Sequence, residues 1–529
     1  GTSGQVLTSA GTGSAPTWTT VSSAPEITGT VTGTLPNGVP VIVHTDGTIK
    51  KAGNEGPTFG THTNFDSDCT KLSCTQMDGD RMCVVYINGS NQLEAVIGDV
   101  SGTSITFGTA TNPSGYGGNA GSVACQFTPQ QSGRVVVIWY NSSNDEVYVT
   151  AMNNSGTWNG SSAVSSIKSN GSPDCIDVTY GSSNKFIFMY SQGTSNYDLY
   201  VRQAILQSNG TFASWTSQNH VDNYVKHAKI VNRPGLNSYG IILYVRGGQN
   251  ELQRCAFAEG ASGVNLSTSS SVIASKVGTN AALPYKTDKP NYINITPNPI
   301  HDSVGAQNIF GYAYLTEPSS GTFELKGGLM SVHAATGSIT IISNATIESA
   351  RRMWIGLAFD NINDQVTSNV DLGLFYSDYN SPYYGFKTRA DVTVNGTSSS
   401  LSAWDTPSTL VSSSCTNTDV SFTTGNTFGG KILFVYRGGA SASSGTAIVR
   451  TPIVSNVTAE NYIGYSNGSF TNGQTGTVKV VGNVATGLSG LTPGQTYYLH
   501  PDGTLNLSAG SPSVVAGTAI TSTSLLIKG

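Results

Sequence analysis

Two short stretches of the chain place a histidine two residues before an aspartate: VHTDGTIK at 43–50 and LHPDGTLN at 499–506. A histidine beside a carboxylate is a common pair for general acid–base chemistry. Asp-Gly is also a strong signal for a tight turn, because glycine supplies the positive φ that such turns need. Across a tight turn the two side chains diverge, and no third polar residue recurs with either pair. We interpret both stretches as one β-hairpin that occurs twice, each with a glycine (Gly38, Gly494) six residues before its histidine.

Hydrolytic chemistry would need two carboxylates roughly 5 to 9.5 Å apart. Candidate acids are Asp174, Asp177, Asp360, Asp364, Asp371 and Asp378, but acids at strand ends and turns usually cap loops. Arg351–Arg352 is the one arginine pair, and NNSGTW (153–158) and SNGTFASW (208–215) lack the aspartate of sialidase Asp boxes. No HExxH or P-loop motif occurs. We therefore expect no catalytic residue, no metal site and no cofactor, and we expect that the protein is not an enzyme.

The composition favours an all-β protein. Glycine contributes 62 of the 529 residues and tyrosine 24, whereas charged residues make up only 11%, less than half of the usual share of about 25%. With 26 basic and 31 acidic residues there is no positive surplus for nucleic acid, and no apolar run reaches the length of a membrane span. We expect neither nucleic-acid binding nor membrane insertion. The seven cysteines are expected to be buried free thiols, with a Cys69–Cys74 disulfide as the one local alternative.

One motif recurs seven times: a nearly continuous apolar run ends in an aromatic residue, and a polar turn and an alternating strand follow. The copies begin at Arg81, Arg134, Lys185, Tyr239, Asn308, Asp371 and Lys431. Their spacing of roughly 51 to 69 residues is typical of propeller blades. A continuous apolar run predicts a strand covered on both faces, and sheets arranged radially provide that cover. We predict a β-propeller of about seven blades; six is the alternative, because residues 280–310 interrupt the rhythm.

Four segments follow from these patterns. Residues 1–30 are polar and are predicted to form an extended assembly segment that orders on a partner. Residues 31–53 form a hairpin that leads into the propeller at 54–460. Residues 461–529 alternate short strands with Pro-Gly, Asp-Gly and Ala-Gly turns, which predicts a small C-terminal β domain.

Aromatic residues in predicted turns are the best candidates for binding. The stretch SDYNSPYYGF (377–386) supplies Tyr379, Tyr383, Tyr384 and Phe386, and Tyr116 lies among glycines at 112–121. Exposed rings beside amides suit the faces of sugars and also protein hot spots. The alternative is that these rings pack between blades. Trp18, in the polar N-terminal segment, is expected to anchor that segment during assembly; the alternative there is a linker with an incidental tryptophan.

Both ends of the chain resemble a known group of proteins. GTSGQVLTSAGTGSAPTW at the N-terminus resembles a segment of bacteriophage tail-fibre and virion structural proteins, and SGTSITFGT at 101–109 resembles a phrase in propeller-containing structural proteins of marine, notably cyanobacterial, phages. GTLPNGVPVIVHTDGTIKKAG is similar to the segment that leads into their propeller, and residues 462–529 are similar to their end domain. The middle of the chain matches unevenly. The resemblance implies a virion component with a tail or fibre location, and it implies no catalytic residues.

We therefore expect a bacteriophage virion protein, located on the extracellular particle, whose propeller attaches to the host surface. Its expected partners are other virion proteins and a host cell-surface glycan or protein. A homo-oligomer is expected, although no heptad repeat indicates a coiled-coil trimer. Two alternatives remain: a capsid-bound decoration protein without a receptor role, and a glycan-degrading propeller enzyme.

Overall fold

The computed structural model describes the whole chain except the following residues: 1–4, 9–11, 21–24, 56–57, 79, 114–118, 130, 160–164, 170–174, 194–196, 233–238, 248–249, 261–262, 268–270, 276, 278–291, 299–306, 361–368, 380–382, 396–397, 423–430, 439–440, 452–453 and 529. For residues 5–8, 19–20, 165–169, 360, 369–370, 421–422 and 454 only the backbone is described. The chain divides into two compact units: residues 58–452 form one, and residues 1–57 together with 453–529 form the other. Helices are absent from the described residues of both units.

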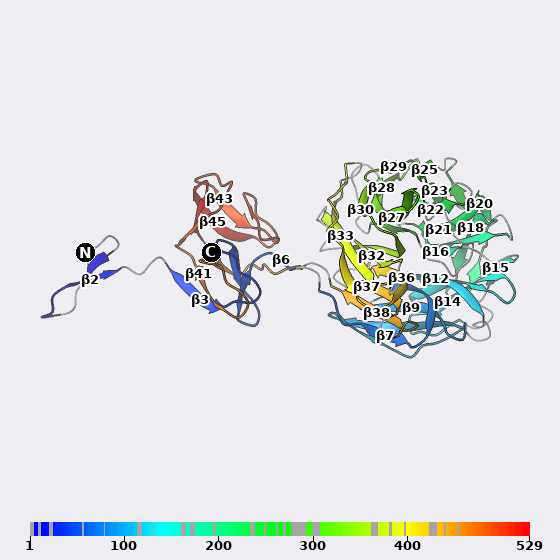
Figure 1. Cartoon of the computed structure of the whole chain (residues 1–529), viewed down its shortest axis with the longest axis horizontal. Helices are drawn as coiled ribbons and strands as arrows, with labels where there is room; N and C mark the ends of the chain where they lie inside the picture. The colour runs from blue at the N-terminus through cyan, green and yellow to red at the C-terminus, as the bar shows by residue number, and fades with distance from the viewer. Residues whose placement is uncertain are drawn as a thin grey trace. The chain divides into compact units, whose positions relative to one another are not determined.

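The larger unit is a β-propeller, and its described residues form seven sheets in a circle (Figure 1). The first three blades are β8 (Cys69–Gln76), β9 (Arg81–Asn88), β10 (Leu93–Ser101), β11 (Ser104–Phe107); β12 (Ala120–Thr128), β13 (Arg134–Asn141), β14 (Glu146–Asn153), β15 (Ser165–Ser169); and β16 (Ile176–Tyr180), β17 (Lys185–Gln192), β18 (Asp198–Leu206), β19 (Phe212–Ala213), β20 (Asn219–Asp222). The fourth and fifth are β21 (Val225–Val231), β22 (Gly240–Arg246), β23 (Glu251–Glu259), β24 (Val264–Leu266), β25 (Ser271–Ala274); and β26 (Ile293–Pro297), β27 (Gln307–Ser319), β28 (Thr322–His333), β29 (Ile339–Ile341), β30 (Ala345–Glu348). The sixth is β31 (Arg352–Asp360), β32 (Asn369–Asp378), β33 (Gly385–Thr393), β34 (Ser400–Leu401), β35 (Ser408–Val411), and the seventh is β36 (Cys415–Phe422), β37 (Ile432–Gly438), β38 (Gly445–Arg450) and β7 (Thr63–Asp66).

The ring of blades closes on itself. The first strand of each blade contacts the first strand of the next, and β36 of blade seven contacts β8 of blade one. Blade seven takes its outer strand from the start of the propeller sequence, because β7 pairs with β38, with Asn64 opposite Thr446. The all-β propeller predicted from the sequence is therefore confirmed, with seven blades in the described residues rather than six.

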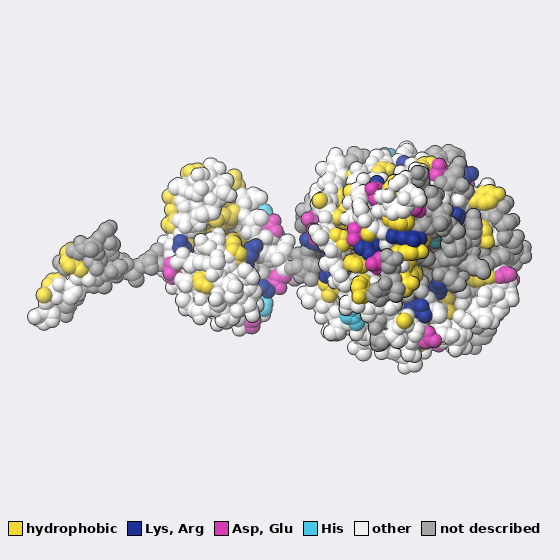
Figure 2. Space-filling view, in the orientation of Figure 1, with side chains coloured by type: hydrophobic (Ala, Val, Ile, Leu, Met, Phe, Trp, Pro, Cys, Tyr) yellow, Lys and Arg dark blue, Asp and Glu magenta, His cyan; other side chains and the backbone are white. Residues whose placement is uncertain are grey.

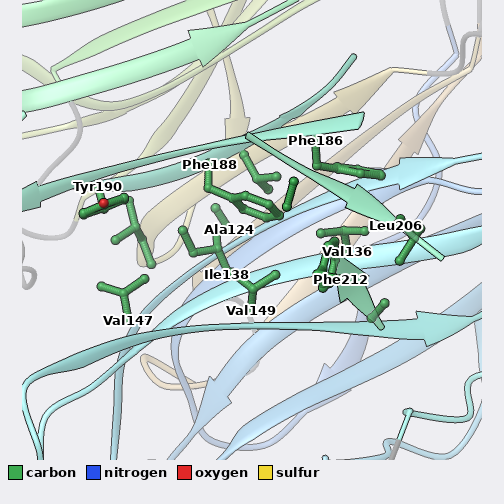
Figure 3. Close-up of a cluster of buried hydrophobic side chains, with 14 of the residues drawn as sticks. Ala124, Val136, Ile138, Val147, Val149, Phe186, Phe188, Tyr190, Leu206 and Phe212 are labelled. Atoms are coloured by element: carbon green, nitrogen blue, oxygen red, sulfur yellow. The ribbon is translucent and has the colours of Figure 1, made fainter. Parts of the chain in front are cut away.

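The second strand of each blade shows why the recurring motif is so apolar. In β13, Val136 and Ile138 pack toward blade three against Phe186 and Phe188 (Figure 3). Trp139 faces the other way and packs toward blade one. A strand in this position is covered on both faces, which a continuous run of large apolar side chains satisfies.

The aromatic residue that ends each motif is a tyrosine whose buried hydroxyl reaches an outer strand or turn. The pairs are Tyr86 with Asp66 and Glu94, Tyr140 with Asp145, Tyr190 with Gln218, Tyr244 with Asp222, Tyr314 with Asn344, Tyr376 with Glu348, and Tyr436 with His62. A buried tyrosine normally finds such a partner for its hydroxyl. In blade six the partner of Tyr376 is Glu348, which also accepts a hydrogen bond from Arg352.

Side chains also join the first strands of neighbouring blades. Asp419 of blade seven accepts hydrogen bonds from the Cys74 amide (2.9 Å) and the Ser73 hydroxyl (3.0 Å) of blade one. Asp177 of blade three accepts one from the Ile230 amide of blade four (3.1 Å). Asn294 of blade five donates to the Ile355 carbonyl of blade six (2.7 Å). The first strands of neighbouring blades lie in different sheets, so no backbone ladder joins them. These side chains supply hydrogen bonds between the blades instead.

The described residues of the smaller unit form two five-stranded sheets, a pair of short strands and an N-terminal hairpin. The first sheet has the order β3 (Glu26–Thr30), β41 (Thr475–Lys479), β40 (Tyr462–Ser466), β4 (Pro40–Val43), β5 (Ile49–Lys51). The second has the order β42 (Val484–Thr486), β46 (Ser524–Ile527), β45 (Val514–Thr521), β43 (Thr496–Leu499), β44 (Leu505–Asn506). The short pair is β6 (Asn54–Glu55) with β39 (Val454–Ser455), and the hairpin is β1 (Gln5–Thr8) with β2 (Thr17–Thr20).

This arrangement differs from the division expected from the sequence. The segment 31–53 does not form a separate lead-in, because β4 pairs with β40 in the same sheet as β5. The segment 1–30 contains the β1–β2 hairpin and the strand β3, which pairs with β41. A two-stranded hairpin is marginal in water, and the β4–β5 hairpin becomes part of a five-stranded sheet because β40 and β41 join it to β3. The small domain is thus built from both ends of the chain.

The two His-x-Asp-Gly-Thr stretches are the same hairpin, as the sequence indicated. Asp46 Oδ1 accepts hydrogen bonds from the Thr48 amide (2.9 Å) and hydroxyl (2.7 Å), and Asp502 makes the same two bonds to Thr504 (2.9 and 2.7 Å). The two histidines have different surroundings: the ring of His44 lies 3.1 Å from Asp46, whereas that of His500 reaches the Ser508 carbonyl at 2.9 Å. The repeated element is a turn, and the histidine chemistry is not repeated.

Candidate functional site

The candidate site lies at one end of blade six, where the link from β30 to β31 meets the turn between β32 and β33. Because β31 and β32 are antiparallel, the first residue of one lies opposite the last residue of the other, Arg352 opposite Asp378. The adjacent residues Arg351 and Arg352 therefore meet the aromatic turn that the sequence singled out. Side chains of blade five complete the site.

Arg352 is the structural member of the arginine pair. Its Nε and Nη2 donate to the two oxygens of Glu348 at 2.9 and 2.6 Å, and its Nη1 lies 3.2 Å from Asp378. The guanidinium lies 4.3 Å from the ring centre of Phe386, which stacks on Tyr376. A two-pronged arginine–carboxylate pair of this kind is strong and directional. Arg352 is 8% exposed, so its donors serve the fold.

Arg351 is surrounded by rings instead of carboxylates. Its guanidinium carbon lies 3.2 Å from the ring centre of Tyr379 and 4.9 Å from that of Phe323. Its Nε has no hydrogen-bond partner among the described residues. Tyr292 lies beside it: burial raises the pKa of the Tyr292 hydroxyl to about 12, and the nearby Arg351 opposes that rise. A cation over an aromatic face is favourable.

Trp354 and Tyr383 adopt an unusual backbone next to this cation. Their φ angles are +48° and +57°, a region that large side chains rarely occupy. Trp354 lies where the pairing of β31 with β32 shifts register, a β-bulge that redirects its side chain. The two rings meet edge to face, with centres 6.0 Å apart and planes at 79°. Backbone strain of about 1–3 kcal/mol per residue is most common at binding and catalytic sites.

The structure separates the residues that the sequence proposed for binding. Tyr379 and Tyr383 pack, half-buried, against the buried Tyr292 between blades five and six. Tyr384 is 38% exposed, whereas Phe386 is held in the Arg352 stack. Tyr379 and Tyr383 thus pack between blades, as the alternative interpretation expected, and Tyr384 faces solvent.

The two remaining candidates lie elsewhere. Tyr116 falls outside the described residues. Trp18 is 53% exposed on β2, opposite Leu7 in the N-terminal hairpin, so it belongs to the other unit. Trp354 and Tyr292 were not predicted from the sequence, because neither a β-bulge nor a neighbouring blade can be inferred from local spacing. For the part of the site outside the aromatic turn, the adjacent pair Arg351–Arg352 was the only signal in the sequence.

The acids considered for hydrolysis lie next to cations where the structure describes them. Asp371 contacts Arg389 at 2.5 Å and Arg450 at 3.5 Å, Asp378 contacts Arg352, and Asp177 lies 3.8 Å from Lys229 in the middle of the ring. On the face seen in Figure 2, basic and hydrophobic side chains gather toward the centre of the propeller. Asp174, Asp364 and the side chain of Asp360 are not among the described residues.

Three further features bear on the chemistry. The seven cysteines are free thiols; six are buried, and burial raises the pKa of the Cys255 thiol to about 11. Within the described ranges no group of three or more His, Cys, Asp or Glu side chains could hold a metal ion. A search of the same ranges finds no helix with the length and hydropathy of a membrane span.

Comparison with known proteins yields similar structures at low identity. No protein family and no curated protein matches the chain. The Aleuria aurantia lectin in complex with alpha-methyl-L-fucoside is 10% identical, over 65% of this chain and 96% of the lectin, with a TM-score of 0.35. The Penicillium chrysogenum alpha-L-arabinanase is 9% identical, over 63% of this chain and 93% of that one, with a TM-score of 0.36. The NanB sialidase of Streptococcus pneumoniae is 9% identical, over 74% and 70%, with a TM-score of 0.35.

These similarities correct one expectation from the sequence. We expected that the protein is not an enzyme, but the similar structures include an arabinanase and a sialidase as well as a lectin. A shared propeller therefore does not exclude catalysis. At these identities and TM-scores, none of the three indicates what this chain binds.

Proposed function

We propose that the protein is a bacteriophage virion protein of a tail fibre or appendage, and that its propeller binds a glycan of the host surface. Binding would occur at the Arg351 cluster, defined as Arg351, Trp354, Tyr379, Tyr383 and Tyr384. The observation that carries the proposal is the Arg351 guanidinium 3.2 Å above the Tyr379 ring, with a buried and unpartnered Nε. Tyr384, which follows Tyr383 of the same cluster in the chain, is 38% exposed.

The chemistry of the cluster suits a sugar. Aromatic faces pack against the C–H faces of pyranose rings, while polar tips and a cation hold hydroxyl or acidic groups. Strained residues such as Trp354 and Tyr383 are pre-positioned, so that less order has to be created on binding. The virion assignment rests on the resemblance of both ends of the chain to phage structural proteins. Other virion proteins are then the partners of the smaller unit, in a homo-oligomer on the extracellular particle.

Binding of the full chain to lipopolysaccharides and capsular polysaccharides extracted from a panel of cyanobacteria tests the proposal. Tyr384→Ala removes an exposed ring and should weaken binding about tenfold, as expected for a binding hot spot. Tyr224→Ala is the matched control: Tyr224 is 44% exposed and precedes β21 of blade four. Equal losses in both variants, or no binding to any polysaccharide, would overturn the proposed site.

Two measurements distinguish the alternatives. Release of reducing ends from a bound polysaccharide would make the protein a glycan-degrading enzyme. The copy number in an intact-virion map would separate a fibre or appendage from a protein that decorates the capsid.

A further inference from the structure

The two sheets of the smaller unit have the same topology. Along the first sheet, the strands come first, fifth, fourth, second and third in chain order: β3, β41, β40, β4, β5. Along the second sheet, β42, β46, β45, β43 and β44 follow the same order. A five-stranded sheet can be ordered in many ways, so a shared order is a specific similarity between the two sheets.

Irregularities of the backbone also coincide. The pairing of β4 with β40 shifts register between Val41 and Ile42, and the pairing of β43 with β45 shifts at the corresponding place, between Tyr497 and Tyr498. Bulges are specific features of a fold and do not recur at equivalent positions by default.

Two glycines show the same equivalence at atomic detail. Gly464 of β40 and Gly517 of β45 have φ angles of +146° and +155°. A Cβ atom on Gly464 would lie 1.9 Å from the Lys479 carbonyl oxygen, and one on Gly517 would lie 2.1 Å from that of Leu526. In both sheets the glycine allows close approach of the neighbouring strand.

The turns complete the match. Gly38 and Gly494, six residues before the repeated histidines, have φ angles of +74° and +82°. In both hairpins the histidine amide donates to the carbonyl of the threonine four residues later, at 2.8 Å for His44 and 2.9 Å for His500. Together with the identical aspartate–threonine bonds, these features define one module that occurs twice.

We infer that the smaller unit is a tandem pair of one five-stranded module, and that the propeller is a guest inserted into the first copy. In the second copy the connection from the third to the fourth strand of the chain, β44 to β45, is residues 507–513. In the first copy the same connection, β5 to β40, is residues 52–461 and contains the whole propeller. This inference does not depend on the proposed glycan site.

The ends of the propeller suit an inserted domain. An insertion is tolerated when the first and last residues of the guest lie close together. The Thr451 amide donates to the Thr58 carbonyl at 2.9 Å, and Phe59 bridges to Arg450. The strand that closes the ring, β7, lies within residues 58–452, so the propeller needs no strand from its host.

Insertion of a small, independently folding domain into the full chain tests the inference. One variant carries the inserted domain between Ala509 and Gly510, in the β44–β45 connection of the second copy. This connection corresponds to the β5–β40 connection that contains the propeller in the first copy. The thermal transition of the smaller unit should then shift by less than about 4 °C, the effect of about 1 kcal/mol. The matched control places the same domain between Asp502 and Gly503, in a turn closed by the Asp502–Thr504 bonds, where it should abolish the transition. Equal damage at both positions would overturn the inference.

A second test cuts the full chain at both boundaries of the propeller. Protease sites replace residues 56–57 and 452–453, and the uncut protein serves as the reference for folding. After double cleavage, the fragment before residue 56 and the fragment after residue 453 should remain one complex, while the propeller separates with its own thermal transition unchanged. Dissociation of the two terminal fragments, or loss of the propeller transition, would show that host and guest are not independent.

Discussion

Both units pair strands that lie far apart in the sequence, but for different purposes. In the propeller, β7 directly precedes blade one in the chain but pairs with β38 of blade seven. The last blade is thereby tied to the first, and every blade is covered on both sides. In the smaller unit, β4 and β40 pair to complete one module beside a second copy. Both units have buried apolar cores, and both contain glycines at which an added Cβ atom would meet a neighbouring backbone. In the modules such a glycine recurs at the equivalent position of each copy, as Gly464 and Gly517. Loss of a ring from the propeller core should cost more stability than a methyl group added to a module glycine, and each change should affect its own unit.

The largest effect is expected in the propeller core. Phe188→Ala removes a ring that is 0% exposed between blades two and three, and it should lower the free energy of unfolding of the propeller by about 3–5 kcal/mol. Calorimetry should show this loss in the propeller transition alone. Leu507→Ala, at a position 52% exposed in the smaller unit, is the control and should change neither transition measurably.

A smaller loss is expected for glycines of the modules. Gly464→Ala and Gly517→Ala each force a Cβ atom against a backbone carbonyl, and each should destabilise the smaller unit by about 2–3 kcal/mol. Gly47→Ala has the same φ problem at +81° but no atom within 4 Å, so it should cost about 1 kcal/mol. Unequal losses for Gly464 and Gly517 in chemical denaturation would contradict the equivalence of the two modules.

The bonds between blades should have a moderate effect. Asp419→Ala leaves the Cys74 and Val420 amides without their side-chain acceptor, which should cost the propeller about 1–3 kcal/mol in guanidinium unfolding. Asp419→Asn retains one acceptor oxygen and should lose less. If the two variants were equally stable, the hydrogen bonds between first strands would not contribute to ring stability.

The smallest effect concerns the turn of the first module. Hydrogen bonds from Thr48 hold the pKa of the Asp46 carboxyl down to about 2. A depressed carboxyl pKa stabilises the fold above the unfolded value of about 3.9, and this contribution is lost as the pH falls through about 2. An NMR titration of Asp46 should show the low value in the native protein and a higher one in Thr48→Val. Thr504→Val, in the second module, should leave the Asp46 titration unchanged.

Much of the fold could be predicted because the propeller repeats a local pattern. The apolar run ending in tyrosine predicts a doubly covered strand, and it does so in each of the seven blades. The pairing of β4 with β40 could not be predicted, because it joins residues about 420 positions apart and neither strand carries a mark of its partner.

The candidate site was predicted only in part for the same reason. Tyr379, Tyr383 and Tyr384 stood out in their turn, but Arg351 and Tyr292 reach them from other elements of blades five and six. The register shift that turns Trp354 is a property of two paired strands and not of either sequence.

Closure of the ring by β7 and β38 also sets when the propeller can finish folding during synthesis. The Thr446 hydroxyl of β38 donates a hydrogen bond to the Asn64 side chain of β7, and the two residues are 382 positions apart in the sequence. At a synthesis rate of about 5–20 residues per second, β7 waits about 20–80 seconds for its partner to leave the ribosome. Throughout that interval the nascent propeller carries an unpaired edge, which is the period in which a chaperone or a neighbouring nascent chain has most access to it.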